Sequence, residues 1–239
     1  MRLQISGVEG LPEVRPGDDL SALIRSAAPD ISTDCIVVVA QKVVSKAEGA
    51  VVDLASIEPS DFARRLAASS NKDPRIVELI LRESRRIVKM DRGLIIAETH
   101  HGFVAANACV DESNVPEGCA TVLPRDPDRS ARALREGLGC GAVIVCDTFG
   151  RPWREGLVNV AIGVAGISAL EDLRGTADRS GRALRSTVVA IADELAAAAG
   201  LVMRKAAGVP LAVIRGYEWS STPGSATDLI RGPETDLFR

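Results

Sequence analysis

The length of the apolar runs constrains the fold of this chain more than any other feature. The longest runs are short, as in Ile36–Ala40 and Ala142–Cys146, which are rich in Val and Ile. Runs of this length between polar residues are typical of buried β-strands, whereas a membrane-spanning helix needs about 20 apolar residues. Strand and helix patterns mix without a regular repeat. We therefore predict an α+β fold with mixed or antiparallel sheets, flanking helices and no membrane partner.

The composition limits the classes of function. Aromatic residues make up 3% of the chain, so Ala, Val, Leu and Ile must build the core, and base-stacking platforms for nucleic acid are disfavoured. The net charge of −3 gives no basic footprint for nucleic acid either. The N-terminal residues lack the apolar segment of a signal peptide. We expect a cytoplasmic protein with no nucleic-acid partner.

Local signals predict several further elements. Asp73 and Pro74 give an N-cap and a first helical position, and the apolar spacing that follows predicts a helix over residues 74–89. Gly200 is the stop signal of a helix predicted over Arg182–Ala199. The other expected elements are strands at Leu94–Glu98, Gly102–Ala106 and Val209–Arg215, and a helix ending near Leu138 with Asp128 or Ser130 as its cap.

Polar residues follow both of the buried strands. Residues 41–46 are interpreted as a polar loop, and Asp147–Pro152 as a sharp turn. A carboxylate at a strand end can face a cleft, and a hard divalent cation prefers carboxylate and hydroxyl oxygens. Asp147 with Thr148, and Asp111 in an irregular segment, are therefore candidate ligands. From spacing alone, Asp147 is better explained as a turn or cap residue than as a metal ligand.

Cations near these acids raise the possibility of phosphoryl transfer. Arg151 and Arg154 follow Asp147 within one loop, and Lys46 lies after the strand that ends at Ala40. Guanidinium groups suit phosphate or carboxylate, and cations offset the charge of a phosphoryl-transfer transition state. The alternative is that they are ordinary exposed side chains. The five cysteines are odd in number and include no CxxC pair, so a disulfide framework is disfavoured. A zinc site is also disfavoured, because the adjacent His100 and His101 would point to opposite faces of a strand.

Together these pieces resemble one family, the coenzyme F-420:L-glutamate ligases. The resemblance runs in order from about residue 7 to residue 219, and the segment Asp147–Gly156, with the sequence DTFGRPWREG, is the most specific part. The other matching segments are Gly10–Val14, Lys42–Gly49, Val110–Val115, Ala192–Ala196 and Val213–Gly216.

The resemblance implies an activity, a fold and a set of ligands. Members join the amine of L-glutamate to a carboxylate of a deazaflavin coenzyme precursor, then add γ-linked glutamates. They use GTP and a divalent cation, Mg or Mn, with K as a monovalent cation. The fold implied is a family-specific α+β arrangement in an intertwined homodimer. The metal ligands implied are Asp111, Asp147 and Thr148, and the nucleotide contacts are Leu11, Pro12, Glu13, Val14, Gln41, Lys46, Asn114 and the segment Met203–Pro210.

The sequence departs from the family pattern at two positions. Leu157 stands where some members have Gln, and Lys205 stands where some have a Gln metal ligand. A charged lysine has no lone pair to give to a metal, so we expect Lys205 to contact phosphate instead. We expect one ligase domain over residues 1–219, possibly of two subdomains, and a surface tail over 220–239, with no room for the C-terminal flavin-binding domain of some relatives.

These residues suit an acyl-phosphate mechanism. The precursor carboxylate would attack the γ-phosphorus of GTP, with Lys46, Arg151 and Arg154 offsetting the charge of two anions that must meet. Two alternatives stay open. One is a nucleotide- and metal-binding regulatory protein without ligase activity, and the other is a related ligase for a different acid acceptor.

Overall fold

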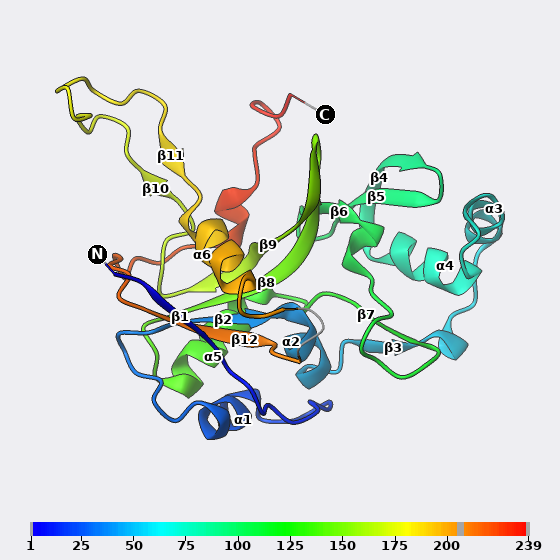
Figure 1. Ribbon diagram of the computed structural model, residues 1–239. Coiled ribbons are helices and arrows are strands. Elements are labelled where there is room, and N and C mark those ends of the chain that lie inside the picture. Colours follow the sequence, from blue (N-terminus) through cyan, green and yellow to red (C-terminus); the bar gives the residue numbers. More distant parts are fainter. Residues whose placement is uncertain (1, 205–207, 238–239) are drawn as a thin grey trace.

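The fold is built on a central mixed sheet (Figure 1). The computed structural model describes residues 2–204 and 208–237. In these residues five strands form the sheet in the order β1-β12-β2-β8-β9, with β2 parallel to β8 and all other neighbours antiparallel. The strands are β1 (Gln4–Gly7), β12 (Leu211–Arg215), β2 (Ile36–Ala40), β8 (Ala142–Arg151) and β9 (Arg154–Ala165).

Helices cover both faces of this sheet. Val37 and Val39 of β2 pack into one buried cluster with α1 (Leu20–Ala27), α2 (Gln41–Ala47) and α5 (Pro127–Leu138). Ile36 and Val38 point to the other face and pack with α6 (Ile191–Gly200). Strands covered on both faces must be apolar at every position, which explains the unbroken apolar runs. The predicted α+β class with mixed sheets is confirmed.

A second lobe has its own buried cluster, which includes Leu66, Ile80 and Ile95 (Figure 1, right). Asp73 caps its second helix through a hydrogen bond from the Arg75 amide, as predicted. The lobe comprises β3 (Val51–Asp53) paired with β7 (Cys119–Thr121), the 3₁₀ turns Leu54–Ser56 and Asn107–Cys109, helices α3 (Asp61–Ser70) and α4 (Pro74–Arg82), and the sheet β4 (Ser84–Asp91), β5 (Leu94–Thr99) and β6 (Val104–Ala106).

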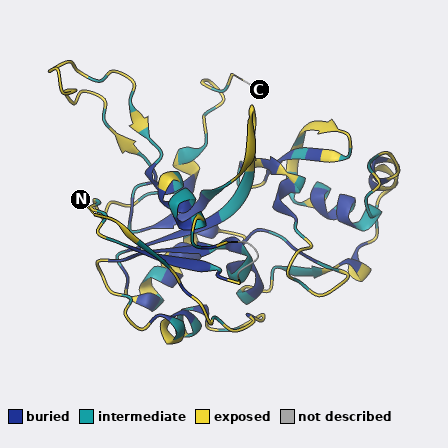
Figure 2. Ribbon diagram, in the orientation of Figure 1, coloured by how far each residue is buried: buried dark blue, intermediate teal, exposed yellow. Residues whose placement is uncertain are grey.

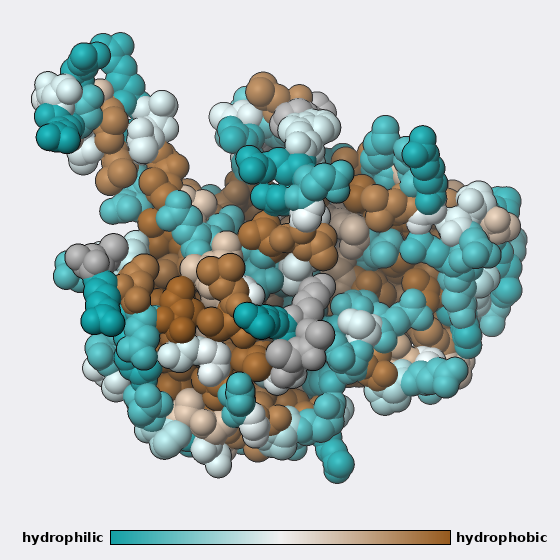
Figure 3. All heavy atoms as spheres, viewed as in Figure 1, coloured by the Kyte–Doolittle hydropathy of each residue, from teal (hydrophilic) through white to brown (hydrophobic). Residues whose placement is uncertain are grey.

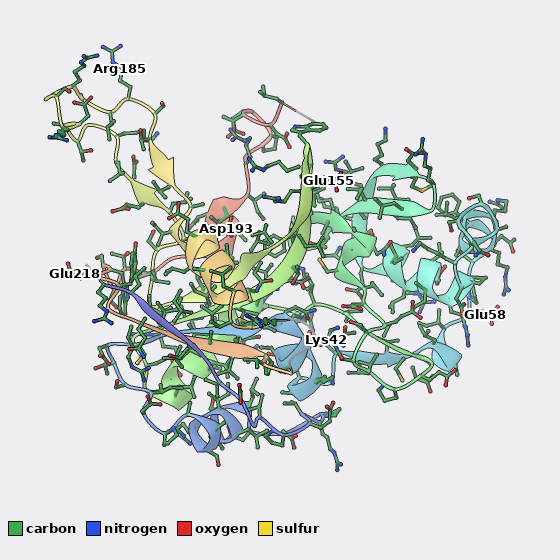
Figure 4. The ribbon with its side chains drawn as sticks, in the orientation of Figure 1. Lys42, Glu58, Glu155, Arg185, Asp193 and Glu218 are labelled. Atoms are coloured by element: carbon green, nitrogen blue, oxygen red, sulfur yellow. The ribbon has the colours of Figure 1, made fainter. Side chains whose placement is uncertain are left out.

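An exposed arm extends from the first lobe. It carries the short strands β10 (Glu171–Asp172) and β11 (Val188–Val189), and its residues are mostly exposed (Figure 2). Hydrophilic side chains cover its outer end (Figure 3), where Arg185 is labelled in Figure 4. No helix in the described part of the chain is both long and apolar enough to cross a bilayer.

A bulge in β9 is held by acidic side chains from two helices. The β8–β9 register shifts between Val145 and Cys146, directly before Asp147. Asp193 of α6 accepts a hydrogen bond from the Ala161 amide at 2.8 Å, and Asp128 of α5 accepts one from the Val164 amide at 2.7 Å. Burial raises the pKa of Asp193 although this amide bond opposes the shift. Bulges re-aim the residues beside them, so the two helices help set the course of β8 at Asp147.

Two predicted helices were wrong in their extent. The helix predicted over 74–89 ends at Arg82, and the chain from Ser84 becomes β4, which pairs with β5. The helix predicted to start at Arg182 starts at Ile191, because the preceding residues belong to the arm. In both cases tertiary pairing overrides local helical spacing.

Both polar segments after the buried strands also differ from prediction. Residues 41–46 form most of α2 rather than a loop, and β8 continues through Asp147 to Arg151 because each residue there pairs with β9. The helix that ends at Leu138 is capped by Asp126 rather than by Asp128 or Ser130. The expectation of a loose tail fails at residues 226–229, which form a 3₁₀ turn in which Ala226 is buried.

We predict that Asp128→Ala lowers the free energy of unfolding by about 2 kcal/mol, because hydrogen bonds to a charged group in this partly buried position are lost. Asp128 accepts from the amides of Val164 and Ala226 and from the hydroxyl of Ser225. Urea denaturation measures the loss. The control is Asp178→Ala on the exposed arm, which should change stability little, and equal stability of the two variants would contradict the assigned role.

Candidate active site

A large cavity lies beyond the end of β2. Its volume is about 810 Å³, and it is walled by the start of α2, the middle of the β8–β9 hairpin, the end of α6 and the segment around Asp111. Ala40 is the last residue of β2 and pairs with Cys146 of β8. Because β8 continues past that point, Asp147 and Thr148 stand at the carboxyl edge of a parallel strand pair, where open sheets commonly bind ligands.

Thr148 is held by a cross-strand partner. Its hydroxyl donates to Oδ1 of Asn159, its neighbour on β9, at 2.9 Å. The amide of Thr148 donates to Oδ1 of Asp147 at 2.7 Å. The backbone of α6 reaches Asn159 at Gly200, where an added Cβ would lie 3.1 Å from the Asn159 amide nitrogen. Thr148 is therefore oriented by Asn159, leaving its oxygen lone pairs for a ligand in the cavity.

Asp111 enters the same cavity from the second lobe. Its carboxylate accepts hydrogen bonds from Nζ of Lys42 at 2.8 Å and from the amide of Ser113 at 2.7 Å. Burial alone would raise the pKa of Asp111, but the bonds from Lys42 and Ser113 outweigh it and hold that pKa below its ordinary value. Asp111 is therefore ionised at neutral pH.

A left-handed turn holds a thiol close enough to both acids to be affected by their charge. Asn107, Ala108 and Cys109 have φ of 53°, 50° and 62°, a conformation that costs roughly 1–2 kcal/mol per non-glycine residue. The pKa of the Cys109 thiol is raised well above its ordinary value, mainly by burial. The carboxylate of Asp147, which accepts a hydrogen bond from the thiol, and that of Asp111 add to it. The two acids thus converge on one side chain.

The wall made by α2 carries a second pair of charges. Nζ of Lys46 lies 2.5 Å from Oε1 of Glu13, and the lysine side chain is 10% exposed whereas the glutamate is 72% exposed. Lys42 and Lys46 are one helical turn apart, so they share a face of α2, and both line the cavity. The cavity lining therefore combines three carboxylates, those of Glu13, Asp111 and Asp147, with two ammonium groups and the guanidinium group of Arg204.

Most of the residues proposed from the sequence come together here. Those that line the cavity are Pro12, Glu13, Val14, Gln41, Lys46, Asp111, Asn114, Asp147, Thr148 and Met203. Leu11 packs against the core instead. Arg151 and Arg154 lie farther along the β8–β9 hairpin, outside the cavity lining, and Arg151 donates to the carbonyl oxygens of Glu155 and Gly156. Lys205 lies outside the described residues.

Sequence reasoning missed three residues of the site, Lys42, Cys109 and Asn159. The spacing of Lys42 and Lys46 was a usable signal, but it has meaning only once residues 41–46 are known to be helical. Cys109 and Asn159 gave no signal because their roles depend on contacts with Asp147 and Thr148, which are distant or cross-strand neighbours.

The donor set fits a hard divalent cation. In the part of the chain that the structure describes, no three His, Cys, Asp or Glu side chains form a group that could hold a metal by themselves. Two carboxylates and one hydroxyl are what Mg²⁺ typically takes from a protein, since waters and substrate phosphates complete its octahedron. Asp111, Asp147 and Thr148 would hold such a cation, with the phosphates of a ligand in the cavity.

The fold and site are typical of an enzyme, because a cavity that places one buried and one partly buried lysine beside carboxylates suits phosphate and metal chemistry. A family model described as F-420-0:gamma-glutamyl ligase matches residues 10–216. The chain belongs to that family and is a ligase, as the resemblance in the sequence indicated.

Relatives match along the whole chain. It is 50% identical to the coenzyme F-420:L-glutamate ligase of Methanothermobacter thermautotrophicus, over 100% of both chains. It is 49% identical to the enzyme of the same name from Methanopyrus kandleri, over 99% of this chain and 98% of the relative. The Methanocaldococcus jannaschii ligase is 44% identical over 100% of this chain and 97% of the relative.

We predict that Cys119 is the first thiol to react in the native protein. Cys119 is partly exposed, whereas Cys35, Cys109, Cys140 and Cys146 are buried. Burial raises the pKa of Cys140 to about 11 and also raises the pKa of Cys109 and Cys146, so little thiolate, the reactive form, exists at neutral pH. Reaction with a chromogenic disulfide, followed by peptide mapping, tests this. Labelling in urea should reach all five cysteines, and rapid native labelling of Cys109 would contradict its placement.

Proposed function

We propose that the chain is a GTP-dependent ligase that joins L-glutamate to a carboxylate of the coenzyme F-420 precursor and then adds γ-linked glutamates. The observation that carries the proposal is that Asp111 and Asp147, far apart in sequence and from different lobes, line one cavity with Lys42 and Lys46. Binding of a nucleoside triphosphate uses this combination of oxygen ligands for a metal and cationic side chains for the phosphates. The names of the relatives support glutamate and the deazaflavin precursor as the other substrates.

The reaction proceeds through an acyl phosphate. An oxygen of the precursor carboxylate attacks the γ-phosphorus of GTP, and the bond from that phosphorus to the oxygen of the leaving GDP breaks. The glutamate nitrogen then attacks the acyl carbon, phosphate leaves, and water or phosphate accepts the proton from nitrogen. Two anions meet in the first step, so neutralisation of their charge is the main catalytic requirement.

The residues of the cavity divide this work. Asp111, Asp147 and Thr148 would hold a divalent cation, Mg or Mn, which would supply neutralising charge at the phosphates. Lys46 reaches the phosphates from the α2 wall after it parts from Glu13, and a potassium ion would add further positive charge. The remaining proposed nucleotide contacts are Pro12, Val14, Gln41, Asn114 and Met203, all of which line the cavity, with Lys205 on phosphate. We propose a cytoplasmic location.

We predict that Asp147→Asn lowers turnover roughly 100-fold or more, because an amide does not hold the cation as a carboxylate does. Phosphate release that depends on both glutamate and precursor is the measurement, with mass spectrometry of the product. Thermal unfolding should be little changed. The control is Asp178→Asn on the arm, with full activity expected. Near-normal turnover of Asp147→Asn would contradict the proposed metal site. Phosphate release without glutamate or precursor would instead favour a protein that only binds and hydrolyses the nucleotide.

The β8–β9 hairpin supports a homodimer. Its tip exposes 84% of Trp153. Leu157, which pairs with Gly150 farther along the hairpin, is 63% exposed and also lines the cavity. Large apolar side chains exposed on a projecting hairpin are typical of a surface that a partner covers. Arg151 and Arg154 lie on the same hairpin, outside the lining of the cavity of their own chain. In a dimer intertwined through this hairpin they would reach the cavity of the second copy.

We predict that Trp153→Ser with Leu157→Ser shifts the protein from the mass of two chains toward the mass of one, because the apolar contact is lost. Light scattering coupled to size-exclusion chromatography measures this. Phe62→Ser on α3, where the side chain is 50% exposed, is the control and should leave the mass unchanged. A wild-type protein with the mass of one chain would refute the dimer.

A further inference from the structure

The ammonium group of Lys42, which lines the cavity, is surrounded by three oxygen atoms. Nζ lies 2.8 Å from Oδ2 of Asp111, 2.7 Å from the carbonyl oxygen of Ser113 and 2.6 Å from its hydroxyl. Its three N–H donors are thereby matched by three acceptors. Carboxylate, carbonyl and hydroxyl oxygens are also the atoms that hard cations prefer. The ammonium group of Lys42 is therefore held by the same kinds of oxygen atom that would hold a metal cation.

This contact lies at the junction of the two lobes. Lys42 belongs to α2 in the first lobe (Figures 1 and 4). Asp111 and Ser113 follow the left-handed turn at Asn107–Cys109, which belongs to the second lobe. The lysine side chain is 17% exposed and the aspartate 39% exposed, so water only partly screens their attraction. The ion pair therefore fixes where Asp111 stands relative to α2.

The contact also limits what Asp111 can do. While Lys42 holds Oδ2, that oxygen is not free for a metal, and a fixed positive charge next to the carboxylate repels a second cation. Lys46 differs because its partner is the exposed Glu13, which is not a proposed metal ligand. The two lysines of one helix face therefore offer a test and its matched control.

We propose that Lys42 is a positioning residue that holds the Asp111–Ser113 segment as an internal cation and exchanges with the divalent cation when the site loads. The inference rests on the proposed function, which places that cation on Asp111. After the exchange Nζ lies on the same wall as Lys46 and faces the anionic ligand. Loading of the metal and exposure of a phosphate-binding ammonium are then one coupled event.

The test is a titration of Mn²⁺ followed by electron paramagnetic resonance, without nucleotide, on the full chain. Lys42→Gln removes the competing charge and should tighten the Mn²⁺ dissociation constant, by about tenfold if the coupling is of typical size. Lys46→Gln removes a charge one helical turn away and should change it clearly less. In the Asp111→Asn background, Lys42→Gln should have little further effect, because the shared partner is gone.

Lys42→Arg keeps the charge and should retain the weak Mn²⁺ binding of the wild type, which provides a second variant if Lys42→Gln folds poorly. Unchanged or weaker Mn²⁺ binding by Lys42→Gln would overturn the exchange, and so would an equal gain from Lys46→Gln. Wild-type protein that binds no Mn²⁺, with Asp111→Asn identical to it, would overturn the proposed metal site itself. The two failures are therefore distinguishable.

Discussion

The parallel pairing of β2 with β8 is the constraint on which the site depends. Because the two strands run in the same direction and β2 stops at Ala40, the continuation of β8 places Asp147 and Thr148 beyond the end of its neighbour. The chain leaving β2 turns directly into α2 and forms the facing wall. The register of a single strand pair therefore brings Asp147 of β8 to the same cavity as the lysines of α2, without a specialised loop.

The surroundings of this strand pair stabilise features that would be unfavourable alone. The bulge in β9 is held by Asp128 and Asp193, which come from helices on opposite faces of the sheet. The left-handed turn at Asn107–Cys109 is strained, and such strain persists only where surrounding structure enforces it. Both features adjoin the cavity, one before Asp147 and the other before Asp111.

Charge in the cavity is balanced internally, and this balance explains how lysines and carboxylates coexist in a partly buried space. Each lysine of α2 is held by an acid, Lys42 by Asp111 and Lys46 by Glu13. A buried ion without such a partner would be costly. In the proposed ligated site a metal would pair with the carboxylate and phosphates would pair with the lysines, so positive and negative charges would stay balanced. The arrangement suits a reaction in which two anions must approach each other.

The sequence by itself determined the class of the fold, the strands Ile36–Ala40 and Ala142–Cys146, the N-cap at Asp73 and the family. These follow from local side-chain patterns and from ordered motifs, which need no knowledge of distant contacts. It also pointed to Asp111, Asp147 and Lys46 as residues that could carry chemistry.

Only the tertiary structure decided where strands replace helices or turns, at Ser84–Asp91 and in β8 after Cys146, because hydrogen bonds to a neighbouring strand outweigh local preference. It alone placed Asp111 beside Lys42 and Thr148 beside Asn159, and it moved Arg151 and Arg154 away from the cavity of their own chain. Residue types and their order name the candidates, but the sheet register sets the distances between them, and distance decides which charges interact.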